Sequence, residues 1–401
     1  MLARAALAAI IASAPTAHPG VVSADPVDTT PHVLDGIVNA IAVVGGTAVV
    51  GGSFSEVSDA ARTTVYPRAN LFAFDLATGR VLPDFAPNVA GPVYGLAAGD
   101  HGTVYVGGEF IGIDNRRSRS LARLSLSDGS LVPGFTSRIG GGMVTTLARE
   151  GSRLYVGGDF LSPRTALARL DANTGAADPG FAIKPDDPLT SGVKVHALDV
   201  SGGRLVVDGS FTTLDGHSRP QLGLIDVSGR TAKVAPWRTE AYARRCADAF
   251  PSYVRGLDFA PDGSYFAVVT TGGARGGMCD TAARFETYAK GTNIRPTWVN
   301  STGGDSLYAV SATGAAVYVG GHQRWLDNPR GRDSPGPGAV SRPGIGAIHP
   351  RTGKALTWNP TRERGIGVKA FSANSSGLLV GSDTTRLGRE YHARIGMFPL
   401  R

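Results

Sequence analysis

The stretch Val156-Gly157-Gly158-Asp159-Phe160 decides how this chain is interpreted, because copies of it recur along the sequence. Three copies are equally clear and three are looser: residues 50–54, 106–110 and 207–211, then 269–273, 319–323 and 380–384. Successive copies lie 56, 50, 51, 62, 50 and 61 residues apart. This period suits one four-stranded β-propeller blade with variable loops. Seven copies therefore predict an all-β fold, a seven-bladed β-propeller.

Each repeat contains signals for four strands. In the second copy we expect strands at residues 93–97, 103–107, 121–126 and 131–135. The second strand is apolar without alternation, as expected when neighbouring blades cover both faces of a sheet. Strand four ends on a large apolar residue, which we interpret as packing between blades and not as a ligand-stacking ladder. The six residues at this place are Phe85, Phe135, Phe181, Trp237, Trp298 and Trp358.

The seventh repeat reaches Arg401 without a fourth strand. Residues 29–34 precede the first inner strand by about the distance at which a fourth strand should lie. We predict that this N-terminal strand pairs with residues 394–398 and closes the ring, which leaves no unpaired sheet edge between the first and last blades. Residues 25–401 would then form one domain.

The N-terminus has the features of an export signal. Arg4 precedes an apolar run over residues 5–11, and small residues allow cleavage after Ala17 or Ala24. We predict a secretory signal peptide over residues 1–24 and a secreted, extracellular product. No later run reaches the roughly 18 to 20 apolar residues of a membrane span. The two cysteines, Cys246 and Cys279, are an even count in an exported chain and predict a disulfide bond.

Composition and charge are those of a turn-rich β protein. Gly occupies 55 of 401 positions, and only 18% of residues are charged. The formal charge is +7, carried by 34 Arg and 6 Lys. Because such a bias also arises from codon composition, we interpret it as a mildly basic surface, with an anion-binding surface as the alternative. We expect a monomer with no nucleic-acid partner.

The longest connection, residues 322–343, carries the candidate ligand-binding residues His322, Arg324, Trp325 and Arg330. A guanidinium forms bidentate contacts and an exposed ring stacks on sugars, so the loop suits a sugar or an anionic polymer. The alternative is a solvated loop with Trp325 packed against its blade. In an up-and-down blade this loop shares one rim with both cysteines, and that rim is where we expect a ligand.

Other charged residues repeat from blade to blade. Glu109 and Asp159 end second strands, and an Arg lies three residues before several third strands, at positions 68, 164, 219 and 342. We expect acid-to-Arg pairs that fix the loop between strands two and three, with a ring of ligand-binding charges as the alternative.

Motifs for catalysis or metal binding are not evident. The eight His residues are dispersed, and the chain contains neither a nucleophile elbow nor a phosphate-binding loop. We therefore predict no catalytic residue, no metal site and no cofactor, with calcium binding at Asp186-Asp187 or Asp327-Asn328 as the alternative left open. Carboxylates from different blades could still converge in the central channel as an acid and a base, which leaves an enzyme open.

The four clear repeats, with residues 279–286, 320–325 and 380–400, resemble a family of exported actinobacterial β-propeller proteins of unassigned function that is built on VYVGGxF repeats. More distantly, they are similar to the delta-sixty repeat proteins and to the propeller part of fungal cortical polarity markers. The resemblance covers residues 33–401 and implies the propeller fold and export. It carries no catalytic residue.

These observations favour a non-enzymatic propeller that binds an extracellular protein or a cell-envelope polysaccharide through one rim. Two alternatives remain: a hydrolase or lyase with a site at the channel mouth, and a structural component of the envelope. An inward-facing cluster of carboxylates or His would favour the enzyme. An aromatic and Arg rim without such a cluster would favour binding.

Overall fold

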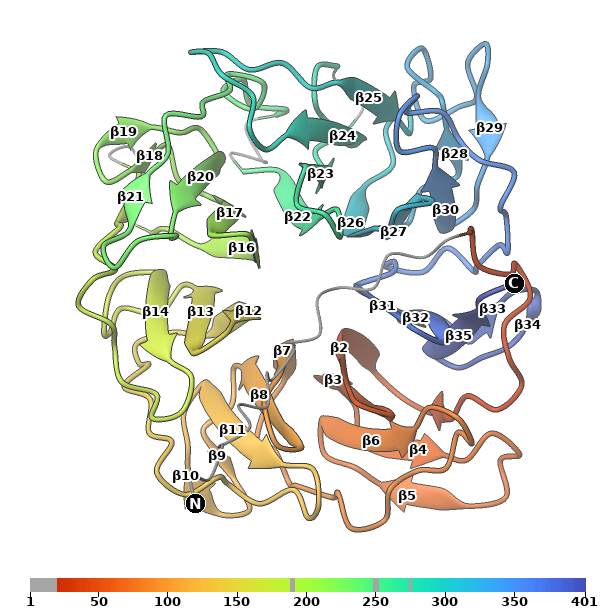
Figure 1. Cartoon of the computed structure of the whole chain (residues 1–401). Coiled ribbons are helices and arrows are strands. Elements are labelled where there is room, and N and C mark those ends of the chain that lie inside the picture. Colours follow the sequence, from red (N-terminus) through yellow and green to blue (C-terminus); the bar gives the residue numbers. More distant parts are fainter. Residues whose placement is uncertain (1–19, 188–191, 248–251, 274–275) are drawn as a thin grey trace, which may run out of the picture.

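The computed structural model describes residues 20–187, 192–247, 252–273 and 276–401. These residues form strands and turns and contain no helix, so none of them forms a helix that could cross a membrane. The sheets are arranged around the centre of the molecule (Figure 1), where their inner strands line a channel. The expected signal peptide lies largely outside the described residues.

Seven sheets of the described residues share one strand order, and we number them 1 to 7 along the chain. Each has an inner strand, a middle strand that carries the repeat motif, and a third strand. In that order they are β2 (Ile37–Val44), β3 (Thr47–Ser53), β6 (Leu71–Asp75); β7 (Val93–Ala98), β8 (Thr103–Gly108), β11 (Leu121–Ser125); β12 (Val144–Glu150), β13 (Arg153–Gly158), β14 (Leu167–Asp171); β16 (Val195–Ser201), β17 (Arg204–Gly209), β20 (Leu222–Asp226); β22 (Val254–Phe259), β23 (Tyr265–Thr270), β24 (Thr281–Glu286); β26 (Leu307–Ala312), β27 (Val317–Gly321), β30 (Ile345–Ile348); β31 (Ala370–Asn374), β32 (Gly377–Gly381), β35 (Ile395–Pro399).

The inner strands line the channel in sequence order. Each contacts the inner strand of the next sheet, and β31 of sheet 7 contacts β2 of sheet 1. The middle strands are buried along nearly their whole length, as β8 and β23 show. Their apolar runs are therefore explained by neighbouring sheets that cover both faces.

The fourth strands are weaker than expected. Only β21 (Lys233–Val234) and β25 (Trp298–Ser301) pair as strands with a third strand in the described residues, and sheets 1, 2, 3 and 6 have single bridges there. One backbone hydrogen bond nevertheless recurs between the fourth segment and the third strand, as from Leu82 N to Ala73 O and from Leu356 N to Ala347 O. The aromatic residues at the ends of these segments are buried, apart from the half-buried Phe135, so the packing interpretation is confirmed.

Short strands in the connections between middle and third strands were not predicted. Five hairpins fill these connections at the periphery (Figure 1): β4 (Glu56–Ser58) with β5 (Val65–Pro67), β9 (Gly112–Ile113) with β10 (Arg116–Arg117), β18 (Thr213–Leu214) with β19 (His217–Ser218), β28 (Trp325–Leu326) with β29 (Val340–Ser341), and β33 (Arg386–Leu387) with β34 (Glu390–Tyr391). A further short strand, β15 (Pro185–Asp186), pairs with β18. Strands this short leave little periodicity in the sequence.

The first Gly of the motif permits contact with the next sheet. A Cβ at Gly107 would lie 2.5 Å from Val144 Cγ1, and one at Gly381 would lie 2.5 Å from Val38 Cγ1. The strand registers show that Val269 holds this place in sheet 5. Val268 pairs with Leu257 there, just as Val156, the residue before the first motif Gly, pairs with Leu147 in sheet 3. The sequence alignment had therefore placed the fifth copy one residue late.

The N-terminal segment reaches sheet 7 earlier in the chain than expected. The strand β1 (His32–Val33) pairs with β4 and not with residues 394–398, so the predicted pairing is wrong. Val27 N instead donates to Met397 O at 2.8 Å, in the place of the recurrent fourth-segment bond, and Ser23 N donates to Pro399 O at 2.8 Å. Residues 29–33 are needed to cross from sheet 7 to the hairpin of sheet 1.

Cys246 and Cys279 form the predicted disulfide, with their Cα atoms 5.7 Å apart. Cys246 lies between sheets 4 and 5, and Cys279 lies between the middle and third strands of sheet 5. The bond therefore ties the connection that enters sheet 5 to a loop within that sheet.

Candidate binding site at the channel mouth

A β-bulge near the start of the inner strand presents one side chain to the channel in six of the seven sheets. The register skips a single residue in sheets 1 to 6. A bulge leaves the extra residue outside the ladder and changes the direction of its side chain. Lys369 comes directly before β31 and aligns with these residues in sheet 7. The seven bulge-position residues are Asn39, Tyr94, Thr145, His196, Arg255, Tyr308 and Lys369.

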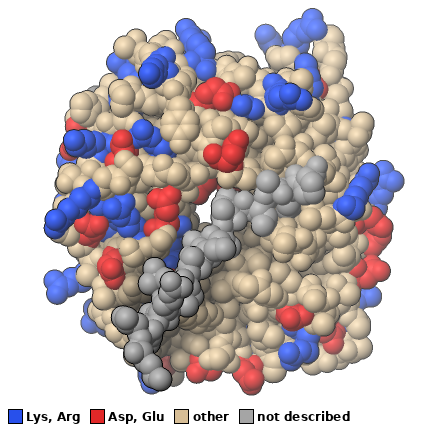
Figure 2. Space-filling view, in the orientation of Figure 1, with Lys and Arg blue, Asp and Glu red and all other residues tan. Residues whose placement is uncertain are grey.

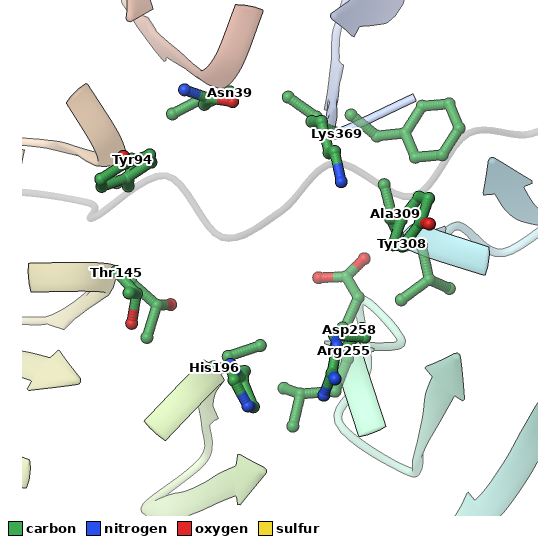
Figure 3. A pocket seen from close by; sticks show the side chains of 18 of the residues that line it. Asn39, Tyr94, Thr145, His196, Arg255, Asp258, Tyr308, Ala309 and Lys369 are labelled. Atoms are coloured by element: carbon green, nitrogen blue, oxygen red, sulfur yellow. The ribbon is translucent and has the colours of Figure 1, made fainter. Parts of the chain in front are cut away.

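These seven residues line one cavity of about 400 Å³ together with Met143 and Lys194. Figure 3 shows how the seven side chains surround the channel. The cavity lies at the end of the channel where the inner strands begin. The connections that enter each sheet lie at this end, and so do the ends of the middle strands. The channel therefore opens on the rim that carries the disulfide. We call this cavity the channel mouth.

The channel mouth is cationic. Lys194, Arg255 and Lys369 line it, and no Asp or Glu is among its described lining residues. An ion pair with Asp159, at 3.7 Å between Nζ and Oδ2, partly offsets the charge of Lys194. Burial lowers the pKa of Lys369 to about 8, which still leaves most of its amine charged at pH 7, and burial also lowers the pKa of Arg255. Lys369 Nζ lies 3.6 Å from the ring centroid of Tyr308. Arg255 donates to Ser252 O at 2.7 Å and to Val254 O at 2.9 Å, which fixes its guanidinium.

His196 is neutral in this setting. Burial first, and then the charges of Arg255 and Lys194, lower its pKa to about 3. Its Nε2 lies 3.4 Å from Ser252 Oγ. The ring therefore offers a hydrogen bond and no charge at physiological pH.

A buried carboxyl group lies behind the cations. Asp208 occupies the place of the first motif Gly in sheet 4, and its Oδ1 accepts a 3.0 Å hydrogen bond from Ala197 N. Its Oδ2 is buried without a hydrogen-bond partner. Burial raises the pKa of Asp208 to about 8, although the charge of Arg255 opposes this shift. The group is thus largely protonated at pH 7 and leaves the channel mouth positive.

A carboxyl pair lies farther along the same strands. Asp199 Oδ2 accepts from Phe259 N at 2.9 Å, and Asp258 Oδ2 accepts from Ala312 N at 2.7 Å. Burial and their mutual proximity raise the pKa of Asp258 well above its usual range, and burial raises that of Asp199 to about 6. Asp258 also lines the channel (Figure 3). The pair therefore holds a proton near neutral pH.

The structure divides the four sequence-predicted ligand residues among three places. Arg324 forms a bidentate pair with Asp305 at 2.8 and 3.0 Å, and its guanidinium carbon lies 4.4 Å from the centroid of the Trp325 ring. Trp325 is half-buried in β28. Both residues are therefore held within the sheet 6 hairpin, as the alternative reading of this loop expected for Trp325.

Arg330 and His322 lie apart from that pair. Arg330 is exposed and lines a groove of about 1040 Å³ beside Cys279. His322 accepts from Ser306 N at 3.3 Å, and its Nδ1 lies 3.3 Å from the Tyr308 hydroxyl. His322 is thus the member of the predicted set that lies next to the channel mouth.

The expected acid-to-Arg pairs are not formed. Arg68, Arg219 and Arg342 donate to backbone carbonyl oxygens of the fourth segment, at 3.2 Å to Pro83, 2.7 Å to Ala235 and 3.1 Å to Leu356. These carbonyl groups lie where strand pairing is weak, so they need side-chain donors. Asp159 instead accepts from Met143 N at 2.8 Å. The sequence prediction of acid-to-Arg pairs is therefore wrong for these three Arg residues.

Surface charge elsewhere is dispersed. Lys and Arg side chains are interspersed with Asp and Glu around the periphery of the face in Figure 2, and the channel is visible as a hollow near its centre. The mildly basic surface expected from composition matches this view. The channel mouth differs because its cations are gathered and partly buried.

Sequence reasoning missed the bulge-position residues, although a signal was present. In each repeat one residue directly follows a Val or Leu at the start of the inner strand, and that residue changes from blade to blade while its neighbours stay small or apolar. Alignment of the inner strands, and not only of the Gly motif, would have identified it.

Comparisons with known proteins concern the fold. A family model described as a β-propeller domain of unknown function (DUF5122) matches residues 152–181. No curated protein matches the chain significantly. The crystal structure of the computationally designed Ika8 protein is similar, with 12% sequence identity and a TM-score of 0.51 over 94% of this chain and 100% of that chain. The WD40 β-propeller domain of Doa1 has 11% identity and a TM-score of 0.45 over 88% and 94%. The chain has an all-β, propeller-like fold.

Proposed function

We propose that the chain is an exported, non-enzymatic β-propeller that binds an acidic cell-envelope polysaccharide at the channel mouth. The observation that carries this proposal is the ring of bulge-position residues with its gathered cations. Charges interact more strongly where water is partly excluded, and a guanidinium binds carboxylate or phosphate oxygens bidentately. The rings of Tyr94 and Tyr308 add surfaces on which sugars stack.

The scaffold of this site is proposed to be seven blades in one ring, which the N-terminal segment closes. The contact of β31 with β2 and the approach of Val38 to Gly381 support this closure. The bond from Val27 to Met397 supplies the missing fourth segment of sheet 7. A chain that starts at Gly36 is expected to unfold at lower temperature and to aggregate, because a sheet edge is exposed. Equal stability and dispersity would contradict the closure.

Export is supported by the disulfide, since such bonds persist in oxidising compartments. The contacts of the first described residues favour signal cleavage after Ala17 over cleavage after Ala24. Val22 N donates to the Tyr318 hydroxyl at 3.0 Å, and Ser23 O accepts from Trp358 Nε1 at 2.8 Å. The mass of the exported protein should therefore correspond to a monomer that begins at His18, and a start at Asp25 would contradict this choice.

The ligand class can be tested by calorimetry with matched acidic and neutral oligosaccharides. The acidic chains should bind, and their affinity should fall as salt rises, because the interaction is electrostatic. Lys369→Gln should weaken binding by about tenfold, the effect of one charge-assisted contact. Lys354→Gln, at an exposed position, should not. Equal binding of neutral chains would contradict the proposal, and binding of no tested chain would favour the structural envelope component.

The carboxyl pair supports a second candidate function, a hydrolase or lyase in the same channel. Two carboxyl groups that share a proton can act as acid and base. If the exported protein cleaves the chains that it binds, Asp258→Asn should abolish turnover and retain binding. Unchanged oligosaccharides after prolonged incubation would favour the binding protein.

A further inference from the structure

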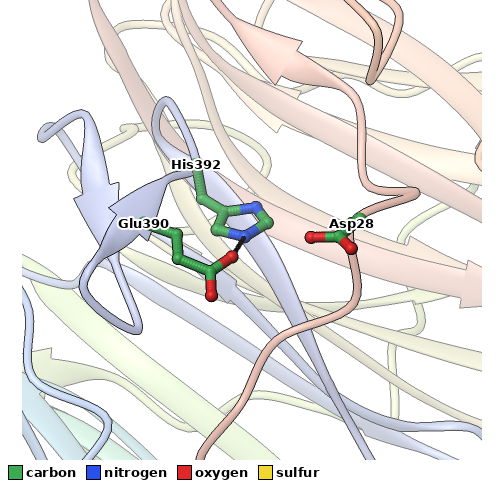
Figure 4. Close-up of side chains that lie close together, drawn as sticks. All are labelled: Asp28, Glu390 and His392. Atoms are coloured by element: carbon green, nitrogen blue, oxygen red, sulfur yellow. Dashed lines mark ion pairs between the residues drawn. The ribbon is translucent and has the colours of Figure 1, made fainter.

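Three potential metal ligands from the two ends of the chain meet beside sheet 7: Asp28, Glu390 and His392 (Figure 4). Their ligand atoms all lie within 4.8 Å of one another. Asp28 directly follows Val27, whose backbone bond to Met397 places the N-terminal segment against the third strand. Glu390 belongs to the hairpin β33–β34, and His392 lies between that hairpin and β35. The cluster thus spans the seam at which the chain ends meet.

His392 occupies a special place in the repeat. A residue with positive φ comes just before the third strand in sheets 1, 4 and 7. Arg68 and Arg219 lie two residues before this residue in sheets 1 and 4, and His392 lies two residues before Arg394 in sheet 7. In sheets 1 and 4 the Arg at this place donates to carbonyl groups of the fourth segment. The shorter imidazole makes no such bond, so sheet 7 has a different contact at this point.

The imidazole of His392 is buried and makes no hydrogen bond, and Glu390 is its ion-pair neighbour (Figure 4). Its side chain is only 3% exposed, and neither ring nitrogen has a hydrogen-bond partner. Nε2 lies 3.7 Å from Glu390 Oε2, which is too long for a hydrogen bond. A buried polar group without a partner costs stability. Asp28 and Glu390 are exposed, so small rotations of their side chains can bring the oxygens closer.

The ligand types select the class of ion. Imidazole nitrogen with two carboxylates suits Zn²⁺, which takes His and acidic ligands and leaves a position for water when three protein ligands are present. Ca²⁺ and Mg²⁺ prefer oxygen ligands alone. We propose that Asp28, Glu390 and His392 bind a divalent transition-metal ion, for which Zn²⁺ is the probe, and that this ion joins the N-terminal segment to sheet 7. The proposal is independent of ligand binding at the channel mouth.

The test uses the exported protein after removal of metal with a chelator. Calorimetric titration with Zn²⁺ should show one saturable site, and Zn²⁺ should raise the unfolding temperature, because an ion that binds only the folded state stabilises it. Asp28→Asn and Glu390→Gln should each weaken Zn²⁺ binding by about tenfold or more while the protein remains folded, since both residues are exposed. His392→Ala should abolish binding.

The matched control is His217→Ala, at the position of Glu390 in the corresponding hairpin of sheet 4, where His217 is exposed. This variant should bind Zn²⁺ like the wild type. The proposal is overturned if the wild type shows no saturable Zn²⁺ binding, or if Asp28→Asn and Glu390→Gln bind Zn²⁺ unchanged. Equal stabilisation by Ca²⁺ or Mg²⁺ would also overturn it, because His392 would then not be a ligand.

Discussion

Sheets 1 to 3 and the junction of sheets 4 and 5 are built from the same repeat, but they differ at the position of the first Gly of the repeat motif. In sheets 1 to 3 the first motif Gly lies against the next inner strand, as Gly107 lies against Val144. At the junction Asp208 replaces this Gly, and His196 and Arg255 lie beside it. The disulfide joins the same region. The regular repeats thus supply the scaffold, and the departures from the repeat carry the chemistry.

The largest loss of stability is expected when the Asp of the junction is placed at the first motif Gly of a regular sheet. In Gly157→Asp the new Cβ would lie 2.7 Å from Val195 Cγ1, and the residue in the place of Arg255 would be the neutral His196. Overpacking, together with a buried carboxyl group that lacks hydrogen-bond partners, should lower the free energy of unfolding by about 3 to 5 kcal/mol, as measured by denaturant titration. Gly46→Asp, in an exposed turn with nothing within 4 Å, should change it little. A Gly157→Asp protein as stable as the wild type would show that close packing is not the reason for this Gly.

Removal of the disulfide should have the next largest effect. The bond closes a sequence separation of 33 residues. In the chain-entropy model, replacing both cysteines with Ser should reduce the free energy of unfolding by about 3 to 4 kcal/mol. Free-thiol titration of the unreduced wild type should find no reactive thiol. Two reactive thiols, or a Ser variant of unchanged stability, would contradict the role of this bond.

Asp208 should give the junction a characteristic pH dependence. Its pKa is raised on folding to about 8, so its protonated form stabilises the folded state at low pH and this contribution is lost as the pH rises toward 8. Asp199 and Asp280, with pKa values raised by burial to about 6 and about 7, act in the same direction. The wild type should therefore be more stable at pH 5 than at pH 8. Asp208→Asn should reduce this difference in stability by on the order of 2 kcal/mol. An unchanged difference would show that groups other than Asp208 cause the pH dependence.

A smaller effect of pH is expected on the affinity for the ligand. The charge of Lys369 is lost as the pH rises through its pKa of about 8. Affinity for an acidic oligosaccharide should fall several-fold between pH 7 and 9, and Lys369→Gln should remove most of this dependence. If the affinity of the Lys369→Gln protein depended on pH as strongly as that of the wild type, a group other than Lys369 would be responsible.

The sequence was sufficient for the repeat, the strand order and the disulfide, because each depends on residues that recur or on a single pair of cysteines. It was insufficient where contacts join distant segments. Asp28 and His392 lie at opposite ends of the chain, and nothing in their local sequence indicates that they meet. The bulges were also hidden, since a one-residue shift in register leaves the apolar pattern on both sides intact. Arg324 and Trp325 have the residue types of a ligand site, but Asp305 and their own hairpin already engage them.

The most direct test of the account compares two sets of substitutions for binding of one acidic oligosaccharide. The first is Arg255→Gln with Lys369→Gln at the channel mouth, and the second is Arg324→Gln with Trp325→Ala and Arg330→Gln in the sheet 6 loop. Calorimetry should show that the first protein loses binding by about a hundredfold or more, equivalent to two charge-assisted contacts, while the second binds like the wild type. The second protein should unfold at a lower temperature, because the buried Asp305 loses the bidentate contact of Arg324. Loss of binding in the loop variant with full affinity in the channel-mouth variant would contradict the account and place the site in the loop.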